Sequence, residues 1–293
     1  MSATGLRSGV LRRVLLLAAV LLVSGCSATQ FMYENAGTLI RWRATSYLDV
    51  HGEQSRELDA RIAAFLAWHR AGALPQYPPI AEEAGKRLAR GLSRDDLDWA
   101  WARGRSQLGE SLRQAAVQVA PLLDQLDAAQ LAHLEQRIAE DNRKFAEENL
   151  AGSEAKRRAE RMKRNVKRLQ EWFGTLSDAQ RERVRAWSER TPLTDALRDA
   201  DRRRRQAELL ALLRKREATK RLADWAEGWD RGRAPEYEAA SRAQRAAFFE
   251  LLLEIDRLLT PEQRAEAVTR LREFARDFAA LAQGPAPGGE AKR

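Results

Sequence analysis

The sequence predicts an all-α fold, a multi-helix bundle of about ten or eleven antiparallel helices. Three observations support this prediction. Apolar residues recur three and four positions apart along most of the chain, which is the spacing that places them on one face of a helix. No window shows the apolar/polar alternation of a half-buried strand. Prolines and glycines gather where the periodic segments begin or end.

The first element, residues 1–25, has the features of an export signal. A basic stretch is followed by an unbroken apolar run at 14–23, then by Ser24, Gly25 and Cys26. The run is about half of the roughly 20 residues that a membrane-spanning helix needs. The residues Val23-Ser24-Gly25-Cys26 resemble a lipobox, the site at which bacterial lipoproteins are cleaved ahead of a lipidated cysteine.

That resemblance implies that Cys26 is the lipid-attachment residue and that residues 26–30 form a lipidated tether. Two or more acyl chains would hold the protein firmly on a membrane. Ser27, rather than Asp, follows the cysteine, which in Gram-negative lipoproteins implies sorting to the outer membrane, facing the periplasm. Because Cys26 is the only cysteine, the domain has no internal disulfide and must be stabilised by its core.

The next element is one helical periplasmic domain at 31–282, with a division into two lobes near residue 152 left open. A Gly- and Pro-rich tail, expected to be disordered, follows at 283–293. The helices are expected at 31–48, 53–71, 77–90, 94–124, 128–150, 154–173, 178–190, 195–216, 218–231, 236–259 and 261–282.

Several helix starts carry the same pattern, a short polar N-cap residue followed three positions later by an acid or a glutamine. The pattern begins at Ser93, Asp127, Ser177 and Thr260, whereas His51 stands where a Ser or Thr is expected, so that start could be frayed. Left-handed helix ends are expected at Gly72, Gly91, Gly174 and Gly232. Pro121 lies inside a periodic stretch, where a kink or break is expected.

The formal net charge of +9 is the next feature that limits the partners. Export argues against nucleic acid, so anionic envelope polymers, lipid headgroups and other proteins are the expected partners. The basic segment Lys156 to Arg168 either docks on anionic headgroups or forms a solvated face paired with acids such as Glu140, Asp141, Glu147 and Glu148 of the preceding helix. Arg202 to Arg205 form a second basic cluster with the same two interpretations.

The chain has eight tryptophans, which either fill the core or line a binding groove or membrane-facing belt. Core filling is the expected role of most of them. Trp225 and Trp229, four residues apart, are expected on one face of a helix.

Leu-Thr-x-x-Gln at 259–263, with its serine variant at 176–180, resembles the repeated signature of the Spy/CpxP periplasmic chaperones. The same residues are also an ordinary helix start. A chaperone that cradles unfolded clients is therefore an alternative function.

No catalytic motif is recognisable, and no cofactor or metal is predicted. His51, His69 and His133 show no metal-binding spacing, and there is no nucleophile elbow or phosphate-binding glycine loop. His69 is expected to interact with the carboxyl end of its helix. Glu110-Ser111 resembles the glutamate-serine pair of peptidoglycan-cleaving lipoproteins, but the flanking residues lack the other patterns of that family. A peptidoglycan-cleaving enzyme is the weakest alternative.

The order of segments along the chain resembles a family of Gram-negative lipoproteins defined only as a domain of unknown function. The matching pieces are the lipobox, FMYENAGTLIRW, LDARIAAFLAWHRAGALPQY, EDNRKFAEENL and LTPEQRAEAVTRLREF. The resemblance implies a location and a helical fold, with no activity to carry over. The function expected from the sequence is that of a membrane-anchored binding or scaffold protein of the cell envelope.

Overall fold

A computed structural model describes residues 28–284, and within that range the chain is helical and contains no strand. This confirms the all-α prediction. Residues 1–27 and 285–293 lie outside the described part, and so do the predicted signal peptide, the predicted lipid-attachment residue Cys26 and most of the predicted tail. The α-helices are Ala28–Glu34 (α2), Ala36–Leu48 (α3), Gly52–Trp68 (α4), Tyr77–Ala89 (α5), Arg94–Leu123 (α6), Ala128–Asn149 (α7), Glu154–Phe173 (α8), Asp178–Arg190 (α9), Asp195–Arg214 (α10), Ala218–Glu227 (α11), Pro235–Asp256 (α12) and Pro261–Gln283 (α13).

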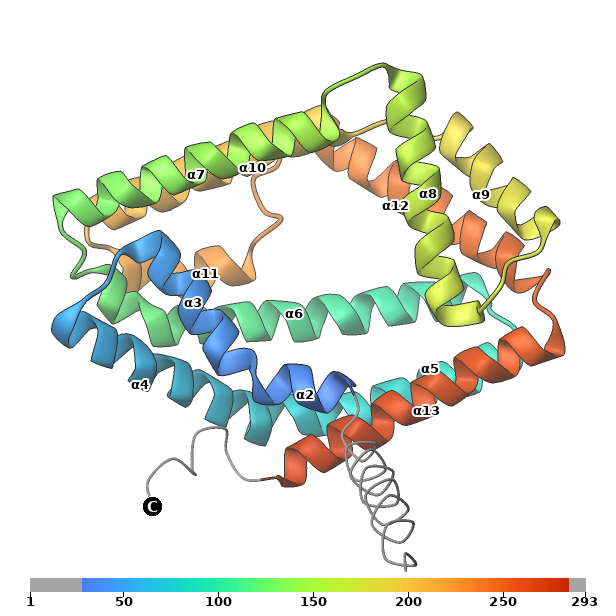
Figure 1. Cartoon of the computed structure of the whole chain (residues 1–293), viewed down its shortest axis with the longest axis horizontal. Coiled ribbons are helices and arrows are strands. Elements are labelled where there is room, and N and C mark those ends of the chain that lie inside the picture. The colour runs from blue at the N-terminus through green and yellow to red at the C-terminus, as the bar shows by residue number, and fades with distance from the viewer. Residues whose placement is uncertain (1–27, 285–293) are drawn as a thin grey trace, which may run out of the picture.

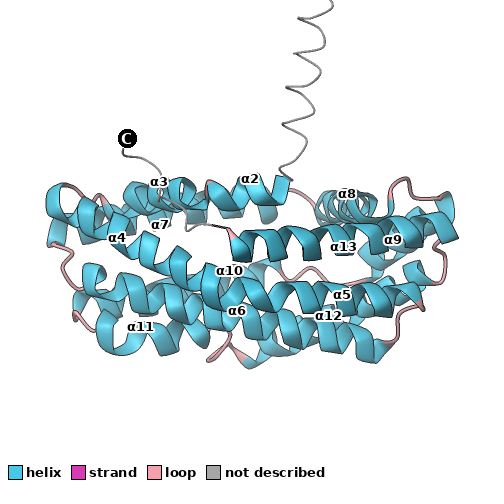
Figure 2. Cartoon of the chain, turned by 90° about the horizontal axis from the view of Figure 1, so that it is seen from below, coloured by secondary structure: helices cyan, strands magenta, loops and turns pink. Residues whose placement is uncertain are grey.

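The helices form a flat frame in which neighbouring elements contact one another in a closed circuit (Figure 1). Helix α7 packs on α10, α10 on α12, α12 on α9, and α9 on α8; α8 contacts α13, and α13 lies along α5. From α5 the circuit returns through α6, α4 and α3 to α7. Figure 2 shows the frame on edge, with α2, α3 and α8 at one broad face and α11 and α12 at the other.

The apolar core has two main parts. The larger is built from α3, α4, α6, α7, α10 and α11, with Leu58, Leu122 and Leu213 fully or almost fully buried. The smaller lies between α8, α9 and α12, around Val184 and Ile255. Further clusters extend it to α5, α6 and α13. Helix α6, 30 residues long, contributes side chains to both parts and thereby joins the two ends of the frame.

The predicted helix starts are confirmed as capping boxes. At Ser93, Asp127, Ser177 and Thr260 the side chain accepts from the backbone N–H three residues later, and the residue at that position accepts from the cap's own N–H. Each box satisfies two of the backbone donors that a helix start leaves free.

The glutamines of three of these boxes, together with Gln54 at the start of α4, form two pairs with equivalent hydrogen bonds. The side-chain amides of Gln180 and Gln263 donate hydrogen bonds to each other at 2.8 and 3.2 Å. Gln180 also donates to the backbone carbonyl of Leu258, and Gln263 donates to that of Thr175. Gln54 and Gln130 make the same four-bond arrangement at the starts of α4 and α7. His51, at the α4 N-cap, makes no side-chain cap bond, but the Gln54 pair holds this start, so the frayed start that was expected is not found.

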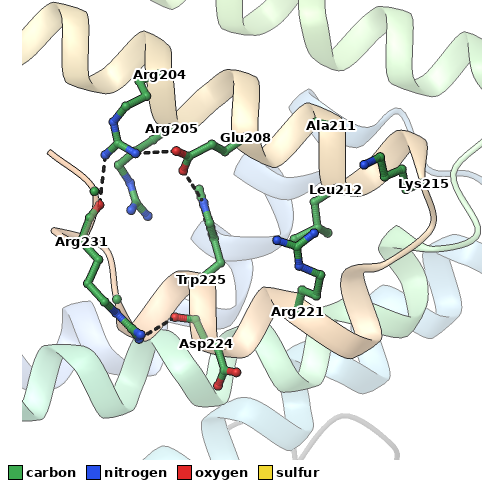
Figure 3. A pocket seen from close by; sticks show the side chains of 12 residues that line it. Arg204, Arg205, Glu208, Ala211, Leu212, Lys215, Arg221, Asp224, Trp225 and Arg231 are labelled. Carbon is green, nitrogen blue, oxygen red and sulfur yellow. Dashed lines mark hydrogen bonds and ion pairs between the residues drawn. The ribbon is translucent and has the colours of Figure 1, made fainter. Parts of the chain in front are cut away.

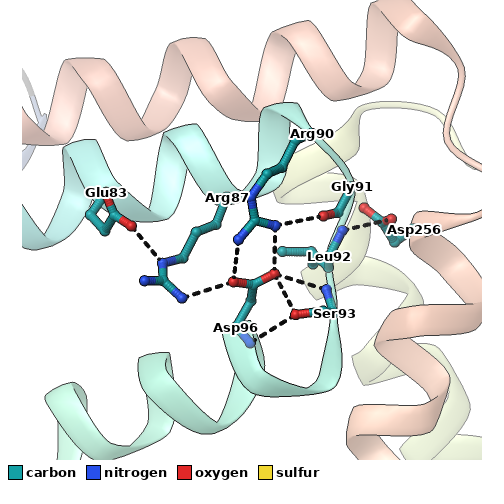
Figure 4. A network of polar contacts seen from close by, with 8 residues as sticks. All are labelled: Glu83, Arg87, Arg90, Gly91, Leu92, Ser93, Asp96 and Asp256. Atoms are coloured by element: carbon teal, nitrogen blue, oxygen red, sulfur yellow. Dashed lines mark hydrogen bonds and ion pairs between the residues drawn. The ribbon is translucent and has the colours of Figure 1, made fainter.

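A polar network joins the α5–α6 turn to the α12–α13 turn (Figure 4). The Asp96 carboxylate, whose side chain is only 2% exposed, accepts from Arg87, Arg90 and the backbone N–H of Ser93 at 2.8 to 2.9 Å. Asp256 accepts from the backbone N–H of Leu92 at 3.0 Å and from Arg264 at 2.7 Å. The hydrogen bond from Arg90 is the main cause that holds the pKa of Asp96 far below its ordinary value, and the hydrogen bonds from Ser93 and Arg87 add to it. Burial acts in the opposite direction but is outweighed.

Several local expectations were wrong. The helix expected at 31–48 is divided into α2 and α3 at Asn35, whose side-chain amide and backbone N–H both donate to the carbonyl of Phe31. The helix is not broken at Pro121 and runs on to Leu123. A proline has no N–H to donate to the carbonyl of Val117 four residues earlier, but Val117 is exposed, so water can take the place of that donor.

The helix ends differ from expectation at several glycine-containing turns. Gly91, Gly174 and Gly232 have positive φ angles, but Gly72 does not. The ψ angle of Gly174, −144°, lies outside the left-handed helical region, and Gly232 lies beyond the end of α11, so neither is the left-handed cap that was expected. Gly72 lies in a π-helical turn at 69–73, which leads through a 3₁₀ turn directly into α5. Helix α11 ends at Glu227, so Trp229 lies beyond it and does not share a helix face with Trp225.

Candidate anion-binding pocket

The hairpin of α10 and α11 borders an open cavity with a volume of about 600 Å³. Leu212 and Leu213 of α10 and Ala218 and Leu222 of α11 are buried in the larger core. A left-handed residue, Arg216, with φ of 54°, reverses the chain between the two helices. The core side chains therefore fix the hairpin and turn the charged faces of both helices toward the cavity.

Trp225 forms one wall of this cavity (Figure 3). The guanidinium carbon of Arg205 lies 4.2 Å from the centre of the indole ring, and the indole N–H donates to Glu208 at 3.1 Å. Glu208 also accepts from Arg204, which donates to Asp201 as well. The ring and the two arginines are thus held by one connected set of contacts.

The turn after α11 supplies the opposite wall. Arg231 donates to the carbonyl of Asp224 at 3.0 Å, and its own carbonyl accepts from Arg204. The Arg231 guanidinium lies directly over Gly228, where a β-carbon would collide with it. Gly228 therefore leaves room for the close approach of Arg231 at the edge of the cavity, and a side chain there would displace the guanidinium.

The lining is cationic, with Arg204, Arg205, Lys215, Arg221 and Arg231 against two carboxylates, Glu208 and Asp224. Arg204 and Arg221 are paired with acids. Among the described residues no carboxylate lies within ion-pair distance of the other three lining cations. Burial lowers the pKa of Arg205, with a further lowering from nearby Arg204. Arginine stays charged, so this positive charge is half-buried and has no direct ion pair, although Glu208 and Asp201 lie near enough to offset part of it.

A second cationic cavity, of about 540 Å³, lies between α8, α10 and the end of α7. It is lined by Arg164, Arg168 and Arg198, none of which has a carboxylate within ion-pair distance in the described part of the chain. A fourth lining arginine, Arg161, donates to the carbonyls of Thr191 and Pro192 at the end of α9. Arginines at the carboxyl end of a helix satisfy its free carbonyls, so Arg161 has a structural role.

The basic segment Lys156 to Arg168 does not pair with the acids that were expected. Helix α8 leaves α7 at a corner of the frame, and α7 packs on α10 and α3 instead. The ion pairs of α8 lie within the helix, from Arg158 to Glu154 and from Lys163 to Glu160. The acids of α7 have other partners, such as Arg43 for Asp141 and Arg137 for Glu140.

The four arginines at 202–205 point to different surroundings. Arg202 donates to Asn142 and lies over the Phe145 ring, and Arg203 pairs with Asp199. Only Arg204 and Arg205 line the α10–α11 cavity. Sequence reasoning identified this cluster and Trp225 but could not connect them, because the connection depends on the hairpin between their helices.

The tryptophans fill the core less than expected. Trp187 is buried, whereas Trp42, Trp101 and Trp172 are exposed and the other four are half-buried. Some half-buried rings lie under arginines, as Trp99 does under Arg87. Most of them therefore lie at the boundary between core and solvent, where an aromatic ring can hold a cation.

Of the two residues considered for catalysis, Ser111 shares a side-chain hydrogen bond with Tyr77, and Glu110 has other partners. Glu110 accepts from Arg113 and Gln114, which lower its pKa. A glutamate that acts as a general acid needs a raised pKa, so this environment does not favour that role. No group of three or more His, Cys, Asp and Glu that could hold a metal is found in residues 28–284.

The three histidines lie apart, each in its own hydrogen-bonded environment. His51 and His133 interact with the backbone carbonyls of Asp49 and Ser46. The ring nitrogens of His69 lie 3.1 Å from the hydroxyls of Tyr33 and Tyr77. Burial lowers the pKa of His69, which opposes the charged helix-end role that was expected.

Comparisons with known proteins give a family but no function. No curated protein and no solved structure matches the chain. No helix in the described part is both long and apolar enough to cross a bilayer. A family model described as a family of unknown function, DUF6279, matches residues 46–237, about two thirds of the chain, including α10, α11 and most of the frame. The chain therefore belongs to this family of unknown function.

Proposed function

We propose that the protein is a lipid-anchored protein of the Gram-negative envelope, held at the outer membrane through Cys26, that acts by binding an anionic envelope component between α10 and α11. The observation that carries the binding proposal is the Arg205 guanidinium, which is half-buried on Trp225 and has no carboxylate within ion-pair distance among the described residues. The lipid anchor rests on the lipobox-like residues at 23–26.

The expected ligand carries phosphate or carboxylate groups. Arginine presents a planar array of donors that matches both groups, and a charge-assisted hydrogen bond to a buried cation is stronger than a neutral one. The cavity volume of about 600 Å³ lies within the range of small-molecule sites. Two sources in the envelope offer this chemistry, phosphorylated lipopolysaccharide sugars and the carboxylates of peptidoglycan stem peptides.

The binding test uses the full chain in uncharged detergent, titrated calorimetrically with two probes. One probe is an acyl-free, doubly phosphorylated glucosamine disaccharide, and the other is a muramyl tripeptide with free carboxylates. Arg205→Met keeps the packing on Trp225 but removes the charge, and it should weaken binding of the recognised probe by about tenfold to a hundredfold. Arg203→Met is the matched control, because Arg203 lies on the same helix, is paired with Asp199 and does not line the cavity.

The two probes distinguish the two sources of the anion. Binding of neither probe, or equal binding by the parent and Arg205→Met, would contradict the binding proposal. The anchor is tested separately: metabolic labelling with palmitate should mark the parent and not Cys26→Ala. Absence of label on the parent would contradict the anchor and leave the binding result intact.

The two alternatives expected from the sequence receive less support. The glutamines of the Spy/CpxP-like segments are engaged in the Gln180–Gln263 pair, which gives that pattern a structural role here. Glu110, the residue considered for peptidoglycan cleavage, is paired with Arg113 and has a lowered pKa. Neither segment lines the α10–α11 cavity.

A further inference from the structure

The two N-terminal helices of the described chain carry a concentrated exposed apolar surface. Eleven large apolar side chains are exposed among residues 28–284, and five of them fall within residues 31–42. Two of these are among the most exposed large side chains of the protein, Trp42 at 67% and Phe31 at 62%. We call this surface the α2–α3 apolar face, and it consists of Phe31, Met32, Leu39, Ile40 and Trp42.

The opposite sides of α2 and α3 are fixed to the frame. The Tyr33 hydroxyl contacts His69, and the Arg70 guanidinium lies 5.2 Å from the centre of the Tyr33 ring. On α3, a β-carbon at Gly37 would lie 3.3 Å from Leu66 of α4. Because Gly37 and Tyr33 point into the frame, the helical period turns Phe31, Leu39 and Trp42 away from it. The apolar face is therefore held in place and has no cover within the described residues.

The sequence places this face next to the proposed lipid attachment. Phe31 is five residues after Cys26, so even a fully extended chain between them spans at most about 18 Å. A bilayer that holds the acyl chains on Cys26 is therefore always within reach of α2. Aromatic residues such as Trp42 are enriched at the boundary between lipid headgroups and hydrocarbon.

Charge complementarity points to the same occupant. Helix α8 lies at the same broad face of the frame as α2 and α3 (Figure 2). It exposes Lys156, Lys163 and Lys167, and of these only Lys163 has a carboxylate within ion-pair distance among the described residues. Exposed lysines near a membrane surface are attracted to anionic phospholipids.

We propose that this broad face of the frame lies flat on a bilayer containing anionic phospholipid, with the α2–α3 apolar face inserted at the headgroup boundary and the α8 lysines over the headgroups. The proposal rests on the lipid anchor of the proposed function, and it adds the orientation of the domain. The alternative is that a second copy of the chain covers this apolar face, and the experiment below distinguishes the two.

The experiment uses the full lipidated chain reconstituted in vesicles of phosphatidylethanolamine and phosphatidylglycerol. Because Cys26 is the only cysteine and is blocked by lipid, a cysteine introduced by Leu39→Cys can be labelled alone with an environment-sensitive fluorophore. Leu108→Cys is the matched control: Leu108 is exposed by 47% against 48% for Leu39, and it lies on α6, away from the face that carries α2 and α3.

The Leu39→Cys label should emit at shorter wavelength than the Leu108→Cys label and should be quenched by spin-labelled lipids, and the Leu108→Cys label should not be quenched. Equal quenching of the two labels would overturn the proposal. A wavelength shift at Leu39→Cys without lipid quenching, growing with protein density, would assign the face to a second copy instead. Flotation of the protein with the vesicles reports the anchor separately from docking.

A second measurement does not depend on the anchor. In a Cys26→Ser background, replacing both Leu39 and Trp42 by Asp should lower vesicle binding by about tenfold or more, since two apolar contacts are lost. Lys163→Glu with Lys167→Glu should lower binding to vesicles with phosphatidylglycerol and leave binding to purely zwitterionic vesicles unchanged. Vesicle binding by the Asp variant equal to that of its parent would overturn the docking surface.

Discussion

Replacing Asp96 by alanine tests whether the α5–α6 turn depends on one buried carboxylate. Asp96 accepts from two arginines and from the N–H of Ser93, and it also completes the capping box of α6. Removing one partner of a buried ion pair leaves charge uncompensated, at a cost of about 3–5 kcal/mol, and a lost cap adds about 1 kcal/mol. Arg87 and Arg90 retain contact with water, which reduces the first contribution. We expect Asp96→Ala to lower the free energy of unfolding by about 3 kcal/mol.

The matched control is Asp98→Ala on the same helix. Asp98 pairs with Arg94, but its side chain is 53% exposed, so its loss should cost no more than about 0.5 kcal/mol. The assay is urea unfolding followed by the helical circular dichroism signal of the parent and both variants. If Asp96→Ala lowers the free energy of unfolding by no more than Asp98→Ala does, burial does not make the Asp96 network stabilising and the reasoning is wrong.

The pH dependence provides a second readout of the same carboxylate. The pKa of Asp96 is held far below the ordinary value of 3.8, so the folded protein keeps this group ionised when the unfolded chain has begun to bind a proton. Its contribution to stability is therefore fully present above pH 3.8 and is lost as the pH falls toward the lowered pKa. The difference between the parent and Asp96→Ala should stay constant from pH 7 to about pH 5 and narrow below about pH 4.

Three further predictions concern other parts of the frame. Gln180→Ala should lower the free energy of unfolding by about 2 kcal/mol, because Gln180 is fully buried and its loss leaves the Leu258 carbonyl without this donor and removes one partner from each polar atom of the Gln263 amide. The double variant with Gln263→Ala should lower it by much less than the sum of the two single variants, and additive losses in urea unfolding would disprove the pairing. Gly228→Ala should displace the Arg231 guanidinium and weaken binding of the anionic probe, while lowering the free energy of unfolding by less than about 1 kcal/mol. Unchanged calorimetric binding by this variant would show that the position of Arg231 over Gly228 is not needed for binding. Burial lowers the pKa of His69 below 6.5, so the unfolded chain binds a proton more readily than the folded protein, and the free energy of unfolding should fall as the pH drops through 6.5. In thermal unfolding, His69→Gln should show a smaller loss of stability over this pH range than the parent. Identical pH profiles for the two proteins would contradict this prediction.

The local parts of the fold could be predicted from the sequence because their causes are local. A capping box such as Ser177 to Gln180 is written in four adjacent residues, and the helix it starts follows from the apolar spacing after it. The errors occurred where a distant contact decides the outcome. The π-helical turn at 69–73 is held by contacts of Arg70 with Leu281 and of His69 with Tyr33, which no local pattern shows.

The candidate pocket was only half predictable for the same reason. Arg204, Arg205 and Trp225 were visible as a basic cluster and an aromatic residue, but the closeness of Arg205 to Trp225 requires the left-handed Arg216 and the buried Leu212 and Leu222. Arg231 was not singled out at all. The one local signal for it is Gly228 three residues earlier, and its meaning depends on a side chain folding back over the glycine.

The two proposals together restrict the source of the ligand. Helix α11 lies at the broad face opposite to α2 and α3. With the α2–α3 apolar face on a bilayer, α11, which forms one wall of the pocket and carries Trp225 and Arg221, would lie on the side of the frame away from that bilayer. Headgroups of the same membrane could not reach this wall, whereas a polymer in the periplasm could. The arrangement therefore favours the carboxylates of peptidoglycan over lipid phosphate, and stronger calorimetric binding of the phosphorylated disaccharide than of the muramyl tripeptide would refute this combination.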